Sequence, residues 1–242
     1  MPLEPVNIAA QPVSVGATFT DPAGAEDETY TCTIDYGDGG VPSVGSISGL
    51  FCSGPHHTYA EPGVYQVIVL VADKDGGQHA AESTSAIIIY DPSGGFVTGG
   101  GWIWSEAGAC RTDDRCTKAK GKANFGFVSK YKMGAEVPTG NIEFNFRVGD
   151  LNFHSDEYQW LVVNQGATNA QFAGSGTLLD GPASNHGVYK FMVWAKDGDP
   201  VHGDTFRIRI WSEDNDSETV VYDNGFDQPI GSGNIAVHSK SR

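Results

Sequence analysis

Acidic and amide side chains gather in turns near the C-terminal end of the sequence. They flank the start of one predicted strand and fill the turn that follows it: Asp197, Asp199, Asp204, Asp214, Asn215 and Asp216. If a hairpin brings the two turns together, their oxygens would suit Ca²⁺, which takes about six to eight oxygen ligands. The spacing is not that of an EF-hand loop. A pair of solvated turns is the competing interpretation, because Asp and Asn favour turns.

Tryptophan and arginine lie on the more polar sides of two predicted strands. Trp194 ends the run 189–194, and Trp211 shares its side of the next strand with Arg207 and Arg209. An aromatic surface beside polar groups is how many β-sandwich modules stack sugar rings, so these four are the candidate ligand-binding residues. We favour packing in the core or at an edge for the two indoles, because Trp buries a large area.

Catalytic signatures are weak throughout the sequence. His154, Ser155 and Asp156 are triad residue types, but adjacent strand residues point to opposite faces of a sheet. The His residues show no zinc-binding spacing, and no glycine-rich loop leads into a helix that would hold a phosphate. We therefore predict that the chain is not an enzyme and that a catalytic domain, if there is one, lies outside it.

Four Cys residues form two close pairs in the sequence, Cys32 with Cys52 and Cys110 with Cys116. Neither pair has metal-knuckle spacing. Two disulfides and an oxidising compartment are the expected outcome, although the spacing allows other pairings.

The formal net charge of the 242 residues is −15, and it is uneven. Residues 1–91 hold 12 acidic side chains and one basic one, whereas residues 92–242 hold 18 acidic and 14 basic. Such a chain repels phosphate backbones, so we expect no nucleic-acid partner. No apolar run is long enough to span a membrane.

Short alternating runs between turn signals predict an all-β chain. Residues 30–36 and 64–72 are such runs in the first half. In the second half, Ile142, Phe144, Phe146 and Val148 alternate with polar residues, as in a half-buried strand. No segment keeps a helical period over three turns. We expect two β-sandwich domains, residues 1–91 and 96–242, joined by a linker at 92–95.

The first domain carries motifs of a known family. Residues 35–39 read DYGDG, residues 57–67 read HTYAEPGVYQV, and residues 71–77 read VADKDGG. In this order they resemble a PKD domain over residues 8–90. The resemblance implies an immunoglobulin-like sandwich that serves as a spacer or interaction module on extracellular proteins and has no catalytic residues. The Cys32 and Cys52 pair departs from the family pattern, and we interpret it as a local staple of the 41–54 insertion.

The second domain resembles an uncharacterised β domain of bacterial surface and secreted proteins, where it stands beside PKD and other immunoglobulin-like repeats. The matching stretches are TGGGWI at 98–103, KANFGF at 122–127, GDLNFH at 149–154 and DTFRIRIW at 204–211. This resemblance implies a location rather than an activity. The strand pattern predicts a jelly-roll-like sandwich.

Together these observations predict a non-enzymatic extracellular binding or adhesion module, secreted or on the cell surface, with calcium as a candidate stabilising ion. Its expected partner is an extracellular glycan or protein. One alternative is a carbohydrate-binding appendage of a secreted hydrolase. Another is a structural spacer or self-assembling surface subunit. The sequence names neither the ligand nor the oligomeric state.

Overall fold

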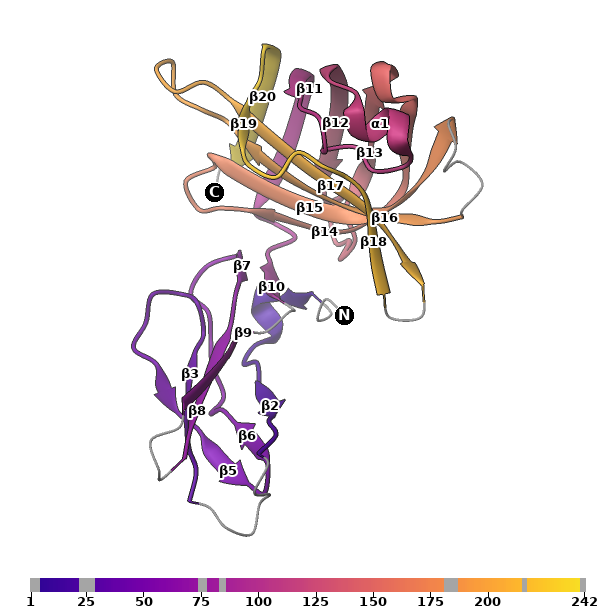
Figure 1. Cartoon of the computed structure of the whole chain (residues 1–242). Coiled ribbons are helices and arrows are strands. Elements are labelled where there is room, and N and C mark those ends of the chain that lie inside the picture. Colours follow the sequence, from indigo (N-terminus) through magenta and orange to yellow (C-terminus); the bar gives the residue numbers. More distant parts are fainter. Residues whose placement is uncertain are drawn as a thin grey trace. The chain divides into compact units, whose positions relative to one another are not determined.

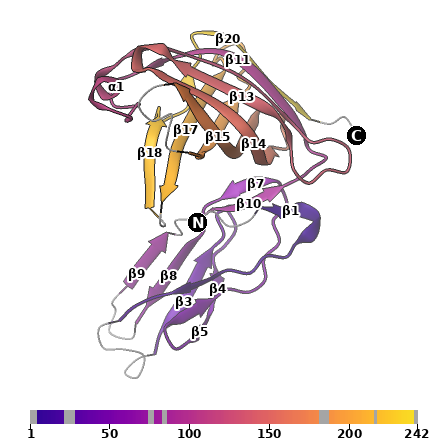
Figure 2. The same ribbon diagram turned by 90° about the vertical axis from the view of Figure 1, so that its right-hand side faces the viewer.

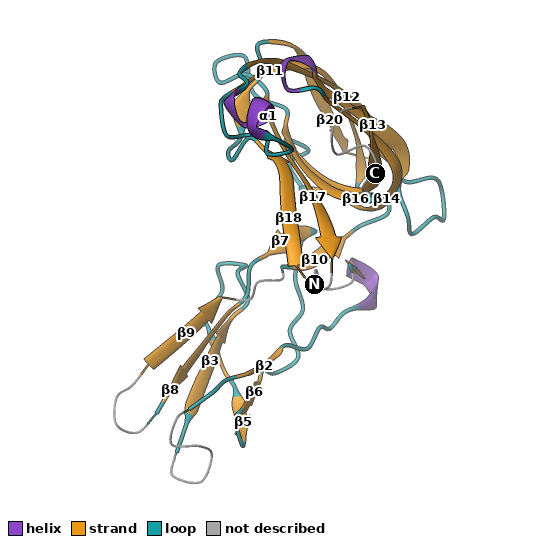
Figure 3. Cartoon of the chain, turned by 45° about the vertical axis from the view of Figure 1, so that its right-hand side comes forward, coloured by secondary structure: helices purple, strands orange, loops and turns teal. Residues whose placement is uncertain are grey.

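The chain is divided into two compact units, Met1–Ile89 and Tyr90–Arg242 (Figure 1). The structure, a computed structural model, describes residues 5–21, 29–73, 78–82, 86–180, 187–214 and 217–239. Strands dominate both units (Figure 3), which confirms the predicted all-β class. Within the described ranges, no helix has the length and apolar character needed to cross a membrane.

Three small sheets build the first unit, with strand orders β1-β10-β7, β2-β6-β5 and β4-β3-β8-β9. The bounds are β1 Val6–Asn7, β2 Gly16–Thr18, β3 Thr31–Asp35, β4 Ser43–Val44, β5 Ser46–Ser48, β6 Phe51–Ser53, β7 Gly63–Tyr65, β8 Ile68–Ala72, β9 Gln78–Glu82 and β10 Ile87–Tyr90, with a 3-10 turn η1 at Ile8–Ala10. The strands are short because Gly, Pro and Ser punctuate this half of the sequence.

A disulfide between Cys32 and Cys52 joins two of these sheets. It confirms the predicted pairing, and both residues are buried in the core of the unit. Gly45 packs directly on the sulfurs, since a Cβ there would lie 2.5 Å from Cys32 Sγ. The bond is therefore a link between sheets in the core as well as a staple of the 41–54 segment.

Two of the three sequence motifs of the first unit, residues 35–39 and 57–67, meet in one aromatic cluster. The ring of Tyr36 stacks on His57 with centroids 4.0 Å apart, and Tyr59 stacks on Tyr65 at 4.1 Å. His57 Nε2 lies 2.9 Å from the Asp38 carboxylate. The Gly40 amide donates to that carboxylate, and this bond, followed by the contact with His57, lowers the pKa of Asp38 below its usual range.

One large antiparallel sheet builds the second unit, in the order β18-β17-β16-β15-β14-β13-β12-β11-β20, with β19 paired to β17. The bounds are β11 Gly95–Ser105, β12 Gly121–Lys130, β13 Thr139–Phe146, β14 Leu151–Val163, β15 Asn169–Asp180, β16 Tyr189–Lys196, β17 Thr205–Asp214, β18 Ser217–Asp223, β19 Gln228–Pro229 and β20 Ser232–Ser239, with α1 at Asp114–Lys118 and a 3-10 turn η2 at Arg147–Gly149. The order is a meander from β11 to β18, whereas a jelly roll contains Greek-key crossovers. The second unit is therefore one curled sheet in place of the predicted jelly-roll-like sandwich.

The sheet curls into a half-barrel (Figure 2). Three register shifts interrupt the pairing of β14 with β15, and such bulges bend a sheet. Gly174 permits close packing there, because a Cβ would lie 2.0 Å from the Glu157 carbonyl oxygen. The bend brings strands that are far apart in the sheet face to face across the core.

Aromatic rings fill the inside of this curl. Phe125 on β12 stacks on Phe206 on β17, with ring centroids 3.9 Å apart, and Phe144 on β13 contacts Tyr222 on β18 at 4.6 Å. The buried phenylalanines of the core are Phe125, Phe127, Phe144, Phe146, Phe153, Phe172, Phe191 and Phe206. Each such ring removes a large apolar area from water.

The second disulfide, Cys110 with Cys116, fixes the loop between β11 and β12, and it also confirms the predicted pairing. Both residues are buried in the core of the unit. Asp113 caps α1, because its side chain accepts a hydrogen bond from the Cys116 amide. An isolated bridge from Cys110 to Tyr222 holds the loop against β18.

Candidate functional site

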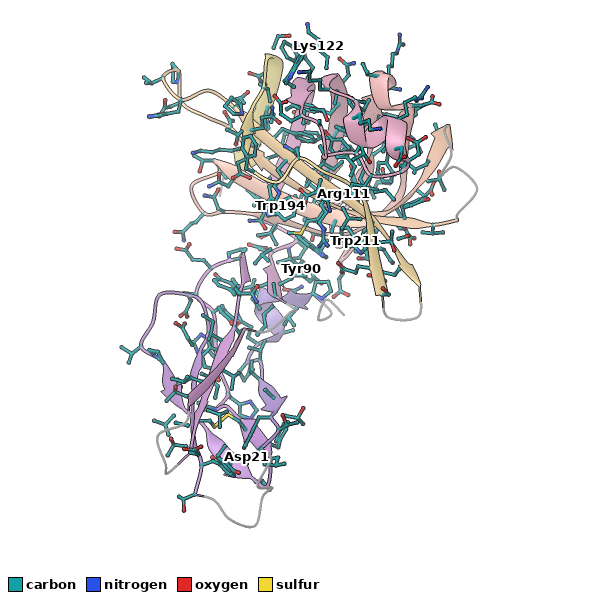
Figure 4. All side chains as sticks on the ribbon, in the orientation of Figure 1. Asp21, Tyr90, Arg111, Lys122, Trp194 and Trp211 are labelled. Atoms are coloured by element: carbon teal, nitrogen blue, oxygen red, sulfur yellow. A yellow bond between two sulfur atoms is a disulfide. The ribbon has the colours of Figure 1, made fainter. Side chains whose placement is uncertain are left out.

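The predicted Trp and Arg residues lie on the outer face of β16 and β17, and Figure 4 labels the two Trp side chains. The register pairs Trp194 with Arg207. The residues that alternate with them along β16 and β17 point into the core. The core-facing residues are Tyr189, Phe191, Val193, Ala195, Phe206, Ile208 and Ile210. Arg209 and Trp211 follow on the same outer face of β17, as the period of two in a strand requires. We call Trp194, Arg207, Arg209 and Trp211 the Trp–Arg ladder.

Each indole of the ladder contacts one guanidinium group. The Arg207 guanidinium carbon lies 4.5 Å from the centroid of the Trp194 ring, and that of Arg209 lies 5.0 Å from Trp211. A guanidinium over an indole face is attracted by the negative electrostatic potential of the ring face, and the attraction is worth about 0.5–1 kcal/mol at exposed sites. The four side chains therefore form two cation–π pairs. Trp194 and Arg207 pair across β16 and β17, and Arg209 and Trp211 pair within β17.

Acidic residues of β18 hold the two guanidinium groups in place. Arg209 Nη2 donates to Glu218 Oε2 at 2.7 Å. Arg207 lies farther from its partner, since its Nε and the Asp223 carboxylate are 3.5 Å apart. The side chains of Arg207 and Arg209 are 28% and 31% exposed, so both guanidinium groups still reach solvent.

The two indoles of the ladder differ in their surroundings. Trp211 is buried, and its Nε1 donates to Glu213. Trp194 is half-buried. Edge packing, the interpretation favoured from sequence, therefore describes Trp211, whereas Trp194 offers the ladder its more accessible ring.

The sequence analysis missed a further polar residue at this face. Gln171 on β15 lies opposite Trp194, on the side away from Arg207. Gln171 Oε1 and Arg207 Nε are both buried without a hydrogen-bond partner. Buried polar atoms are normally paired, so these two atoms, on either side of Trp194, are exceptions. Only the strand register places Gln171 here.

Two of the predicted calcium ligands have a structural role. Asp204 accepts hydrogen bonds from the Gly198 amide at 3.0 Å and from the Ile235 amide at 2.6 Å, using both of its oxygens. Asp197 Oδ2 accepts from the Val237 amide at 3.0 Å. These bonds tie the turn between β16 and β17 to the edge of β20 that does not face β11. We call Asp197 and Asp204 the carboxylate clasp.

The remaining predicted calcium ligands are Asp199, Asp214, Asn215 and Asp216. Asp199 is exposed, and its hydrogen bonds with His202, followed by one from Val201, lower the pKa of its carboxyl group. Asn215, Asp216 and the side chain of Asp214 lie outside the described part of the chain. Among the side chains that the structure describes, no group of three His, Cys, Asp or Glu residues is placed to hold a metal ion. Calcium binding by these turns stays a prediction.

The triad residue types at 154–156 are drawn apart by the strand. Ser155 is buried, and its hydroxyl accepts a hydrogen bond from the Ile142 amide. His154 lies on the outer face, where it contacts Glu143. Ser155 therefore satisfies a backbone donor inside the sheet, on the face opposite to that of His154.

Comparison with known proteins assigns the first unit. Residues 5–89 match the family described as PKD domain, and they form such a domain in this chain. This confirms the resemblance seen in the sequence motifs. The match ends at residue 89, and the second unit has no family assignment. No curated protein and no solved structure matches the chain. PKD domains are typical of extracellular binding and adhesion modules, and the two disulfides agree with that setting.

Proposed function

We propose that the chain is a non-enzymatic extracellular binding or adhesion module, secreted or on the cell surface, in which the Trp–Arg ladder is the ligand-binding face. The observation that supports this most is the pairing of each indole with a guanidinium group on two adjacent strands. The PKD domain supports the extracellular setting, and it serves as a spacer or a second interaction module.

A ligand for the ladder needs two chemical features. It presents a ring or apolar face to the half-buried Trp194, and it presents acceptor or anionic groups to Arg207 and Arg209. A donor on the ligand would also satisfy Gln171 Oε1. An extracellular glycan has this mixture of ring faces and polar groups, and this favours a second candidate function, a carbohydrate-binding appendage of a secreted hydrolase.

A glycan array tests the ladder with matched Trp variants. We expect Trp194→Ala to remove the signal for the preferred glycan, because the ring contact is lost. Trp104→Ala is the control, since Trp104 is 43% exposed and belongs to β11 rather than to the strands of the ladder. Binding that survives Trp194→Ala refutes the ladder as the ligand face. Loss of binding in both variants points to a general loss of fold.

A purely structural spacer or self-assembling subunit is tested separately. Size-exclusion chromatography with light scattering over a range of concentrations measures the mass of the particle. A strict monomer argues against self-assembly, and a concentration-dependent mass that Arg209→Ala lowers would assign the ladder to contacts between copies.

A further inference from the structure

A row of polar side chains crosses the outer face of β11 to β14, apart from the ladder. The register aligns Ser232 with Trp102, Trp102 with Asn124, Asn124 with Asn145, and Asn145 with Asn152. The neighbouring strand positions face the core: Ile103, Ala123, Phe125, Phe144, Phe146, Leu151 and Phe153. We call Asn124, Asn145 and Asn152 the amide row. Figure 4 labels Lys122, two residues before Asn124, at the opposite end of this unit from Trp194 and Trp211.

Two glycines beside the amide row have no internal reason to be glycine. Gly100 and Gly126 are paired across β11 and β12, next to Trp102 and Asn124. A Cβ at Gly126 would meet nothing within 4 Å, and one at Gly100 would only touch the Phe125 carbonyl oxygen at 3.6 Å. Neither residue has a positive φ. Glycine weakens a strand interior, and it often marks a place where an outside group approaches the backbone.

Side chains flank the bare backbone at these glycines in two directions, along β11 and across to β13. Trp102 forms one boundary, fixed by its indole hydrogen bond to Ser232 and by Lys122 Nζ at 4.1 Å from its ring centroid. Glu143, opposite Gly126, and His154 form the other, and these two side chains are hydrogen-bonded to each other. The amide row and the two glycines thus form a polar strip with the Trp102 indole at its β11 end, and we call this strip the trough.

Asn145 supplies an observation that is independent of the glycines. Its Oδ1 is buried and has no hydrogen-bond partner. An unpaired buried acceptor is unfavourable, and because the Asn145 side chain as a whole is half-buried, a turn of its amide would offer this oxygen to a hydroxyl or amide donor from outside the chain. Its neighbours in the row are amides that both donate and accept.

We propose that this trough binds a neutral polysaccharide chain that lies across strands β11 to β14. Neighbouring strands are about 4.8 Å apart, close to the length of one sugar ring, so successive amides would meet successive rings. Hydroxyl groups match side chains that donate and accept, and the glycines let a ring reach the backbone. The row and its flanking residues carry Lys122 and Glu143 as opposite charges, which suits an uncharged ligand.

The chemistry of the trough disfavours two other kinds of partner. An apolar protein surface would need a cluster of aliphatic or aromatic anchors, whereas the large apolar side chains beside the row are Trp102 and Trp104, both at its β11 end. A phosphate polymer would be repelled by the net charge of −15.

Affinity gel electrophoresis of the full chain, with hydroxyethyl cellulose, xyloglucan or galactomannan in the gel, tests the proposal. Gly126→Val is the central variant, because the open space at its Cβ lets it fold while the trough is filled. We expect at least one polymer to retard the wild type, and Gly126→Val and Asn145→Ala to weaken binding by about tenfold or more. Thr219→Val, an exposed position on β18, should bind as the wild type does.

The outcomes separate this site from the ladder. Trp194→Ala should leave retardation by a neutral polymer unchanged, so failure of the ladder and failure of the trough are seen in different variants. The proposal is overturned if none of the three polymers retards the wild type, or if Gly126→Val binds unchanged while its thermal midpoint equals that of the wild type. It is also overturned if Gly126→Val converts a dimer into a monomer, which would make a second copy the occupant.

Discussion

Removing the Asp204 carboxylate should open the curled sheet of the second unit. Both of its oxygens accept backbone hydrogen bonds, and one donor, the amide of Ile235, belongs to a residue that is 1% exposed. A hydrogen bond to a charged group contributes about 1.5–3 kcal/mol, and a buried donor left unpaired loses its solvation as well. Two such bonds give an expected loss of about 3–6 kcal/mol in the free energy of unfolding for Asp204→Ala.

Urea unfolding in the presence of EDTA measures this loss without any contribution from calcium. Asp204→Asn keeps one acceptor oxygen and turns an amide group toward the other donor, so we expect roughly half of the loss. Asp199→Ala is the matched control in the same turn, because its carboxylate is exposed and should matter little. Hydrogen exchange at the amides of Ile235 and Val237 provides a local readout.

The reasoning is refuted if Asp204→Ala and Asp199→Ala unfold at the same urea concentration. It is also refuted if exchange at the Ile235 amide is unchanged in Asp204→Ala, because that amide would then have another acceptor. If Asp204→Ala does not fold, the intermediate loss in Asp204→Asn still carries the comparison.

Three further predictions concern pH, packing and metal. Burial raises the pKa of Tyr158 and Tyr222 above the ordinary value of about 10, so their contribution to stability is complete below that pH and is lost as pH rises beyond it. Tyrosinate absorbance and circular dichroism should therefore change together in alkali, and tyrosinate formation in a still-folded unit would contradict this. Gly45→Ala should destabilise the first unit by about 1–3 kcal/mol in urea unfolding, because a Cβ there meets the buried disulfide, whereas Gly126→Ala should be neutral. If the turns around Asp199 bind calcium, millimolar Ca²⁺ should raise the thermal midpoint relative to EDTA. An unchanged midpoint would refute calcium binding at this concentration.

Much of the strand pattern follows from local sequence. Ile142, Phe144 and Phe146 are buried as their alternation predicts, because a period of two sends them all to one face. Val148 fits the same pattern but is 53% exposed, since β13 ends at Phe146 and the chain turns into η2. The alternation of residue types does not indicate where a strand ends.

The roles of the polar residues depend on contacts between distant parts of the chain. The sequence analysis placed Trp194 and Arg207 on polar sides of their strands, and the register brings them together. Asp204 looked like a metal ligand because its neighbours are acidic. Its partner, the Ile235 amide, is 31 positions away, so no local pattern indicates the hydrogen bond.

The pairing of β11 with β20 also brings the two ends of the second unit together, since Gly95 is aligned with Ser239. A short linker could therefore join them, and new termini could be opened in the turn between β12 and β13, where Met133 is 98% exposed. Such a circular permutant would turn the most distant strand pair of the unit into a local hairpin. The new termini make β12 and β13 the distant pair instead, so the mean sequence separation of contacts changes little, and the permutant should keep the same sheet and fold at a comparable rate.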